Sequence, residues 1–357
     1  MTGVVRSERP ASARRLVVRR GPVALRLRVR TLVVGVVLTV AAIAIAMVSL
    51  ASGDFPVPLG DVLRALAGQG DAGAEFIVVT LRLPRVLVAL LVGAALAASG
   101  AVFQSLTRNP LGSPDFIGLT TGASTGALLV ILILDERGLP VAVGAMVGCV
   151  ATSVAVYLLA FQRGTNAFRL ILMGIGVSAL LESANSFLLV RARLSDALAA
   201  QVWLIGSVGG RSFTDVALVG IPLAVVLPVL LVLARQLSML NLGDETAALN
   251  GVPVERSRVA LALSAVVLAA TATAAAGPVA FVALAAPHLA TRLTRAPGPG
   301  ILPAAAMGAV LMVAGDWLAQ RVLPTRDVPV GVVTAALGGA YLTWLLAREW
   351  RRGRALG

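Results

Sequence analysis

Two acidic residues, Glu182 and Asp316, stand inside long apolar segments of this sequence. An ionisable side chain within such a segment is costly to bury, and it marks a functional site unless a partner compensates it. Glu182 and Asn185 are expected to line or gate a pathway. Glu182 could instead lie toward the outer end of its helix, pair with an arginine or be protonated. Asp316 is close to Arg321, so an ion pair or a helix-end hydrogen bond is expected there.

The chain has one histidine, His288, and one cysteine, Cys149, which excludes chemistry that needs several such ligands. A disulfide within the chain and a Cys/His metal cage are both impossible, and we expect neither a metal site nor a cofactor. Cys149 lies in an apolar run and is expected only to pack. His288 follows Pro287 and is expected to make a structural hydrogen bond. No Ser-His-Asp set can be assembled around it, which argues against an enzyme.

All 30 basic residues are arginine, and the formal net charge is +13. A Walker A loop needs a lysine for the nucleotide phosphates, so the chain has no P-loop of its own. Schiff-base chemistry on a lysine is excluded as well. Nine arginines fall in residues 1–30, with no aromatic residue between them. This pattern favours a cytosolic tail beside a membrane over a nucleic-acid site.

The composition indicates a multi-span membrane protein. Hydrophobic residues make up 58% of the 357 residues and charged residues only 13%, whereas soluble domains carry about 25% charge. Several charge-free runs approach or exceed the roughly 18 residues that cross a bilayer. We predict an all-α polytopic protein with about ten transmembrane helices, at 31–50, 84–106, 116–134, 141–161, 170–190, 216–234, 259–276, 278–294, 301–320 and 329–347.

An even number of spans places both ends of the chain on one side of the membrane. With both ends inside, 21 of the 30 arginines lie on the cytosolic side, as positive-inside sorting requires. We therefore expect a plasma-membrane protein with a cytosolic tail at 1–30, a ten-span domain at 31–348 and a second cytosolic tail at 349–357. The third span could be broken after NPLGSPDF, and the eighth is interrupted at Pro287 and His288.

Two connections are too long and too patterned to be simple turns. Residues 51–83 lie outside in this topology and contain PLGDVLRALAG, which predicts a short amphipathic helix. Residues 235–258 lie inside, where Gly243 and Gly251 punctuate two expected short helices. Asp244 and Glu245 begin the second of these, and acidic side chains suit a helix N-terminus.

Small residues crowd the second span, in VGAALAASGAVFQSL. Their spacing lets helix backbones approach closely, so the expected role of this face is packing within a bundle. The alternative is that the face lines a pathway together with Gln104 and Ser105.

Several motifs in order resemble the iron-siderophore and cobalamin ABC importer permeases, the FecCD-type family. They include RLPRVLVALLVGAALAASGAVFQSLTRNPLGSPDFIGLTTGAS, LILMGIGVSALL, VWLIGSVGG, LGDETAALNGVPVERSR, GPVAFVALAAPHLATRLTR and VPVGVVTAALGGAYLTWLL. The resemblance covers about residues 30–348. The strings FVALAAPH and TAALGG resemble ferric-enterobactin-type permeases in particular.

The resemblance implies a type II ABC importer permease. Its partners would be a cytosolic ATPase dimer, an external siderophore-binding protein and a second permease subunit, identical or a paralogue. It assigns Gly243, Asp244, Glu245 and Gly251 to the element that docks on the ATPase. Residues expected along the translocation path are Gln104, Ser178, Glu182 and Asn185, although the role of Glu182 does not come from the family.

The resemblance also places Arg82 and Arg85, in RLPR, at the outer mouth, where they would meet acidic residues of the binding protein. Their alternative role is to anchor the span at the lipid headgroups. The family often has an arginine four residues after the aspartate of the ninth span, and here that position is Gln320. Both Arg321 and Arg326 are therefore eligible as the third docking arginine.

The expected function is the membrane subunit of an importer for ferric siderophores that works by alternating access, without catalysing a reaction itself. Because the iron arrives chelated, no metal ligands are expected. A cobalamin or haem importer permease is the alternative within the family. A secondary transporter would need a network of ion-coupling carboxylates in mid-membrane, for which only Glu182 is a candidate.

Overall fold

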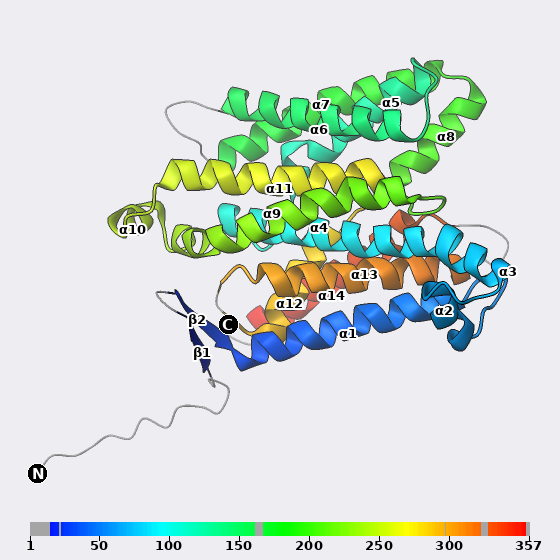
Figure 1. The fold of residues 1–357 in the computed structure, drawn as a ribbon. Helices are drawn as coiled ribbons and strands as arrows, with labels where there is room; N and C mark the ends of the chain where they lie inside the picture. Colours follow the sequence, from blue (N-terminus) through cyan, green and yellow to red (C-terminus); the bar gives the residue numbers. More distant parts are fainter. Residues whose placement is uncertain (1–14, 21–22, 161–166, 297, 323–327, 355–357) are drawn as a thin grey trace, which may run out of the picture.

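The structure is a computed structural model that describes residues 15–20, 23–160, 167–296, 298–322 and 328–354. It is a bundle of helices that run roughly side by side (Figure 1). Seven helices of the described chain are long and apolar enough to cross a membrane. The long helices are α1 (Val29–Ala51), α4 (Leu83–Thr107), α6 (Leu139–Ala160), α7 (Ala167–Arg191), α9 (Phe213–Leu240), α11 (Val254–Ala276) and α13 (Ile301–Val322), with the α4 span extending back to Ala72.

Four further helices complete the bundle. They are α5 (Leu119–Leu132), α8 (Leu194–Ile205), α12 (Val282–Thr294) and α14 (Val330–Arg354). Each of the ten predicted spans contains a helix, which confirms the all-α polytopic fold. Helix α8 lies outside all ten predicted ranges, because its 12 residues are too few to cross a bilayer and leave no full-length apolar run.

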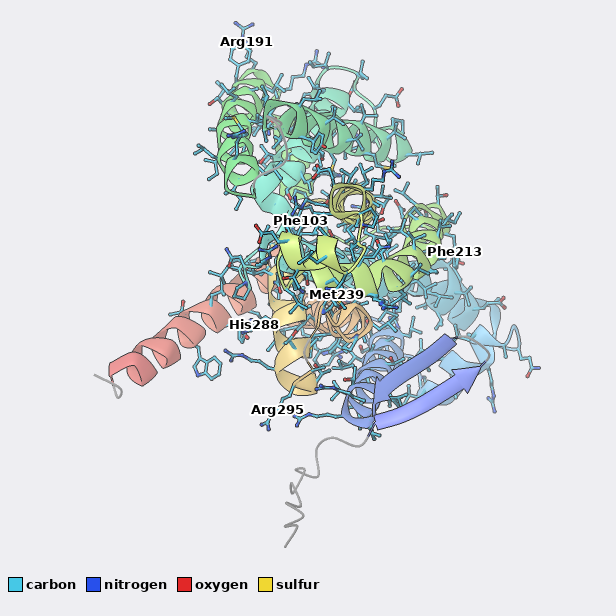
Figure 2. The ribbon with its side chains drawn as sticks, turned by 90° about the vertical axis from the view of Figure 1, so that its left-hand side faces the viewer. Phe103, Arg191, Phe213, Met239, His288 and Arg295 are labelled. Carbon is cyan, nitrogen blue, oxygen red and sulfur yellow. The ribbon has the colours of Figure 1, made fainter. Side chains whose placement is uncertain are left out.

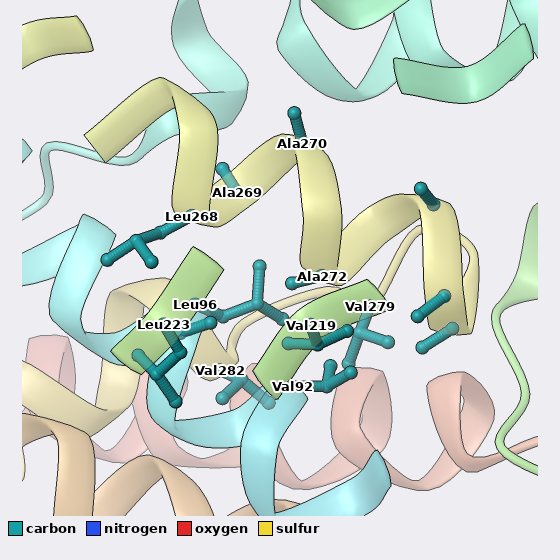
Figure 3. Close-up of a cluster of buried hydrophobic side chains, with 14 of the residues drawn as sticks. Val92, Leu96, Val219, Leu223, Leu268, Ala269, Ala270, Ala272, Val279 and Val282 are labelled. Atoms are coloured by element: carbon teal, nitrogen blue, oxygen red, sulfur yellow. The ribbon is translucent and has the colours of Figure 1, made fainter. Parts of the chain in front are cut away.

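Helix α4 forms the centre of the bundle and packs against α13, α11, α9 and α12. Its small residues permit this. A Cβ atom at Gly93 would overlap the Gly308 carbonyl oxygen of α13, and one at Gly100 would overlap the Ala283 carbonyl oxygen of α12. The packing role predicted for this face is therefore correct. Figure 3 shows the adjoining apolar core, where Leu96 and Val219 meet α11.

The segments before α4 and after α9 mark the two ends of the bundle. At one end lie α2 (Leu59–Leu66), α3 (Ala72–Glu75) and a π-helical turn, Phe76–Arg82, that leads into α4. At the opposite end lies α10 (Asp244–Leu249), between α9 and α11 (Figure 1). Helix α2 is the amphipathic helix predicted within 51–83, and it buries Val62 and Ala65.

Two local predictions are corrected by the structure, and one element of the N-terminal tail was not predicted. Residues 235–240 belong to α9, so 235–258 contains one short helix, α10, instead of two. The eighth span is not interrupted at Pro287, which lies within α12; the break falls at 277–281, where Phe281 has a φ of 67°. The N-terminal tail contains an antiparallel ribbon, β1 (Arg15–Arg20) and β2 (Val23–Arg28), which continues into α1.

Candidate functional site

A cavity of about 750 Å³ opens on the side of the bundle that α7 and α14 flank. Figure 2 views the bundle from the α10 end and shows α7, which ends at Arg191, and α14, in red, projecting on that side. Ser178 and Glu182 of α7 line the cavity one turn apart, together with Asp115 of the 3₁₀ turn Pro114–Ile117. Helices α5, α8 and α14 and the segment Pro278–Ala280 between α11 and α12 supply the remaining walls.

At the wall of this cavity toward the α2 end, the C-terminal ends of α8 and α11 meet the N-terminal end of α14. The Ser207 amide after α8 donates to the Ala276 carbonyl at the end of α11, over 2.7 Å, and the Gly331 amide of α14 donates to the Gly206 carbonyl, over 3.1 Å. A Cβ atom at Gly331 would overlap the Ile205 carbonyl oxygen. These two bonds satisfy backbone groups at the helix ends inside the protein, as a membrane requires.

Glu182 is the most informative of the predicted path residues. It is exposed and stands 15 residues into the 25-residue helix α7, far from either end. Its carboxylate makes no hydrogen bond or ion pair within the described chain. A carboxylate at mid-helix that faces lipid is strongly disfavoured, so its position at the cavity favours a water-filled path. Asn185, one turn further, is buried, and its Oδ1 accepts no hydrogen bond from the described residues.

Gln104 lies apart from these residues, in a second cavity of about 210 Å³ at the α10 end. Its Nε2 donates to the Leu284 carbonyl of α12 over 2.9 Å. Ser105 and His288 line the same cavity, and the His288 ring meets the edge of Tyr341 at 6.1 Å between centroids. The four predicted path residues are thus divided between the two cavities and the protein interior.

The predicted ATPase-coupling residues lie within α10 or in the turns at its two ends. The Asp244 carboxylate at its start accepts hydrogen bonds from Arg108, over 2.7 Å, and from Arg258, over 2.8 Å. The Arg258 hydrogen bond is the main reason that the pKa of Asp244 lies below its ordinary value, and the Arg108 charge adds to it. Because Arg108 caps the C-terminus of α4 and Arg258 lies in the second turn of α11, one carboxylate links α10 to two spans.

Helix α10 projects from the bundle, and the other three predicted coupling residues lie on it or in the turns beside it. Glu245 is exposed, and Leu249 has 89% of its surface exposed. Gly243 has φ 120° and ψ 151° and Gly251 has φ 76°, backbone conformations that favour glycine. The short helix is therefore bounded at both sides by turns that a larger residue would strain.

At the α2 end, Arg85 forms a buried ion pair with Asp316 of α13. Its Nη2 lies 3.0 Å from Oδ1 and its Nε 3.1 Å from Oδ2. Only 17% of the Arg85 side chain and 1% of the Asp316 side chain are exposed. The ion pair expected for Asp316 is present, but with Arg85 instead of Arg321. Gln320 also donates to this carboxylate, over 2.8 Å.

Two other arginines of the predicted docking set have different surroundings. Arg82 donates to the carbonyl oxygens of Leu50 and Phe55, over 2.8 and 2.7 Å, and so joins α1 and the following loop to α4. Arg321 is exposed and lies over the Trp317 ring at 4.4 Å. Arg326 lies outside the described residues.

Sequence reasoning missed Asp115 and Arg108. Asp115 lies in NPLGSPDF, which was read only as a break before the third span, and its Ser-Pro-Asp pattern is a helix-start signal that could have drawn attention to it. Arg108 was counted only as an inside charge. In the described part of the chain, no group of three or more His, Cys, Asp or Glu residues could hold a metal ion.

The bundle of broken and continuous spans, with a short helix projecting at one end, is that of an ABC importer permease. Residues 27–348 match the FecCD transport family, and this chain belongs to that family. It is 44% identical to the ferric enterobactin transport system permease protein FepG of Escherichia coli over 90% of this chain and 98% of that protein. It is 42% identical to the achromobactin transport system permease protein CbrC of Dickeya dadantii, over 86% and 89% of the two chains.

The fold is shared with a solved metal-chelate type ABC transporter in an inward-facing conformation. The TM-score is 0.78 at 28% sequence identity, and the match covers 88% of this chain and 99% of the solved one. This chain is accordingly a multi-pass membrane permease subunit of an ABC importer.

Proposed function

We propose that this chain carries ferric siderophores across the plasma membrane by alternating access, with ATP hydrolysed by separate cytosolic subunits. The observation that carries the path assignment is Glu182, an exposed carboxylate at the middle of a membrane helix and at the rim of a large cavity. Such a group is tolerated where a path holds water and not where lipid covers it. The names of similar permeases supply the substrate class.

A second permease subunit, identical or a paralogue, would cover the side on which the cavity opens. Alone, α7 and α14 would expose the carboxylate-lined cavity to lipid tails. A partner of the same fold across this side would enclose the cavity between two walls. The path would then run along the interface between the subunits, as in a transporter whose halves rock against each other.

We place α10 and both termini in the cytosol. Helix α10 would contact the ATPase through exposed residues such as Leu249, while the Asp244 hydrogen bonds to Arg108 and Arg258 transmit its movement to α4 and α11. Gly243, Glu245 and Gly251 would shape this contact. The positive-inside bias of the sequence supports this orientation.

The α2 end would then face the binding protein. Among the described residues of the predicted docking set, the exposed Arg321 would meet its acidic residues, and Arg82 would add its positive charge although its guanidinium also donates to two carbonyl oxygens; the Arg85 guanidinium is committed to Asp316. Exposed charge pairs add about 0.2–1 kcal/mol each, but complementary charges speed encounter and fix orientation. The change Arg321→Glu should slow uptake and reduce its dependence on salt, with acidic-to-basic changes on the binding protein restoring part of it.

Uptake by a deletion strain tests the substrate class. A strain lacking this chain should fail to grow on one or more defined ferric siderophores as sole iron source and should recover when the chain is returned. Growth defects confined to haem or cobalamin would assign those substrates instead. The purified chain should hydrolyse no ATP until its ATPase partner is added; uptake that persists without any ATPase would indicate a secondary transporter.

A further inference from the structure

The ribbon of β1 and β2, which precedes the first membrane span, has two faces of opposite character. The strands pair antiparallel, with Val17 opposite Arg26. Because successive residues of a strand belong to opposite faces, this register sorts the ribbon into two sets. The apolar face carries a single arginine and consists of Leu16, Val18, Arg20, Val23, Leu25 and Leu27. The basic face carries four arginines and consists of Arg15, Val17, Arg19, Ala24, Arg26 and Arg28.

The ribbon is attached to the α10 end of the bundle, at the start of α1. Strand β2 continues directly into α1, and the Arg30 Nε in the first turn of α1 donates to the Leu293 carbonyl of α12 over 2.8 Å. Figure 2 looks along the helices from this end and shows the ribbon extended across the view. The ribbon therefore lies across the end of α1 instead of continuing along its axis, which is the orientation of an element at a membrane surface.

Such a ribbon needs a surface that covers its apolar face. Two antiparallel strands alone are marginally stable in water, and the main neighbour of β2 outside the ribbon, in the part of the chain that the structure describes, is α1. A membrane interface offers acyl chains to an apolar face and phosphate groups to a basic one, as it does for an amphipathic helix. The two edges of the ribbon would stay among hydrated headgroups, since an open edge is not tolerated in the hydrocarbon core.

Lipid suits this position better than the ATPase does. Helix α10, the proposed ATPase contact, is carried by α9 and α11, whereas the ribbon is carried by α1, which packs on α13 and α12. Leu32 and Val36, near the start of α1, are exposed, so lipid borders the helix from which the ribbon extends. Arg295, exposed at the end of α12, adds positive charge at the same end of the bundle (Figure 2).

We propose that the ribbon lies on the cytosolic leaflet and binds its anionic phospholipids. The apolar face would rest on the acyl chains, and the arginines of the basic face would lie at the level of the phosphate groups. The proposal rests on the cytosolic placement of the termini in the proposed function and goes beyond transport, because it assigns a lipid-binding role to the tail. A basic tail without strands would also be attracted to anionic lipid, but it would not distinguish one residue from the next.

The test uses the variants Leu16→Cys, Val17→Cys and Val18→Cys, each in the Cys149→Ala background and labelled with a fluorophore. The full chain is reconstituted in phosphatidylcholine vesicles with and without phosphatidylglycerol, before and after its ATPase is added. Lipids with a nitroxide on the acyl chain quench a label that reaches the membrane interior. The labels at positions 16 and 18 should be quenched, and the label at position 17 should not, although valine is itself apolar.

Removing phosphatidylglycerol should lower the ratio of membrane-bound to free ribbon at least about fivefold, because each arginine near an anionic surface contributes about that factor. The exchange Leu25→Arg/Arg26→Leu keeps composition and net charge but places an arginine on the apolar face. It should reduce the quenching of the Leu16→Cys label. A label at Thr246→Cys in α10 is the control and should stay unquenched in both kinds of vesicle.

Equal quenching at positions 16, 17 and 18, or quenching that the exchange leaves unchanged, would overturn the proposal. Labels that only the added ATPase protects would assign the ribbon to that partner instead. The readout does not depend on uptake. If the predicted alternation is found but Thr246→Cys reacts from outside intact cells, the cytosolic placement is wrong and the ribbon binds the opposite leaflet.

Discussion

The ion pair between Arg85 and Asp316 joins the start of α4 to α13 in a nearly water-free place. Two charges withdrawn from water are costly, and their mutual attraction compensates the cost only with good geometry and further donors. Here the arginine is bidentate and Gln320 supplies an additional hydrogen bond. Removing one partner leaves the other charge buried, which costs more than losing an exposed pair.

Asp316→Ala should therefore destabilise the protein by about 3–5 kcal/mol. Thermal unfolding of the purified chain in detergent would measure this as a lower midpoint. The double variant Arg85→Met/Asp316→Leu should recover most of the loss, because it leaves no charge unpaired. The exposed pair Asp61–Arg64 provides the control, and Asp61→Ala should shift the midpoint little. Equal midpoints for the Asp316 and Asp61 variants would contradict the interpretation.

The Asp244 carboxylate should give the protein a small stability that depends on pH. Its pKa is lowered in the folded state by the hydrogen bond from Arg258, so the folded protein favours the charged form. The contribution is complete above the ordinary aspartate pKa of about 3.9 and disappears as pH falls through the lowered pKa. With 48% of the side chain exposed, it should not exceed about 1 kcal/mol.

Comparing Asp244→Asn with the wild type between pH 3 and 7 tests this. The difference in unfolding midpoint should be largest near pH 7 and shrink toward pH 3. Glu245→Gln is the matched control, since this neighbouring carboxylate makes no ion pair in the described chain, and it should produce no such trend. A constant difference across the pH range would show that the Asp244 charge is not the source.

At the scale of elements, α10 depends on the turn that precedes it. Gly243 is in a conformation that side chains rarely adopt, so Gly243→Ala should cost about 1–3 kcal/mol of local strain. We expect the variant to insert normally but to lose most of its ATP-driven uptake. The strained turn would prevent α10 from keeping its hydrogen bonds to Arg108 and Arg258 and contacting the ATPase at the same time. Uptake and membrane content measured together would separate these effects.

Gly35→Ala offers a matched control for this change, since Gly35 lies within α1 and has no atom near the position of an added Cβ. Uptake by Gly35→Ala should equal that of the wild type. If Gly243→Ala also transports normally, the turn before α10 does not carry the coupling.

At the scale of the whole molecule, the two ends of the bundle should face opposite sides of the membrane. Cys149 is the only cysteine and is buried, so Cys149→Ala provides a background free of thiols. In that background, a cysteine at Thr246 in α10 should react with an impermeant reagent only after the cells are opened. A cysteine at Gln69, beyond α2, should react in intact cells. The reverse pattern would invert the topology.

The membrane class, the helical fold and the positions of the spans follow from the sequence, because long apolar runs separated by charged loops have few other stable structures. The order of motifs was sufficient to place the chain in its family. Short segments were the least predictable: α8 carries too few residues for a span signal, and the break at 277–281 depends on contacts with α8 and α14.

Only the tertiary structure decided which polar residues meet. Arg85 and Asp316 are 231 residues apart in the sequence, and no local pattern pairs them. Asp115 and Glu182 share one cavity because α7 packs on the turn before α5, whereas Gln104, expected in the same path, lines a separate cavity at the α10 end. Hydropathy and spacing determine where helices begin and end, but the neighbours of each helix are selected by close packing of small residues, which the linear pattern does not encode.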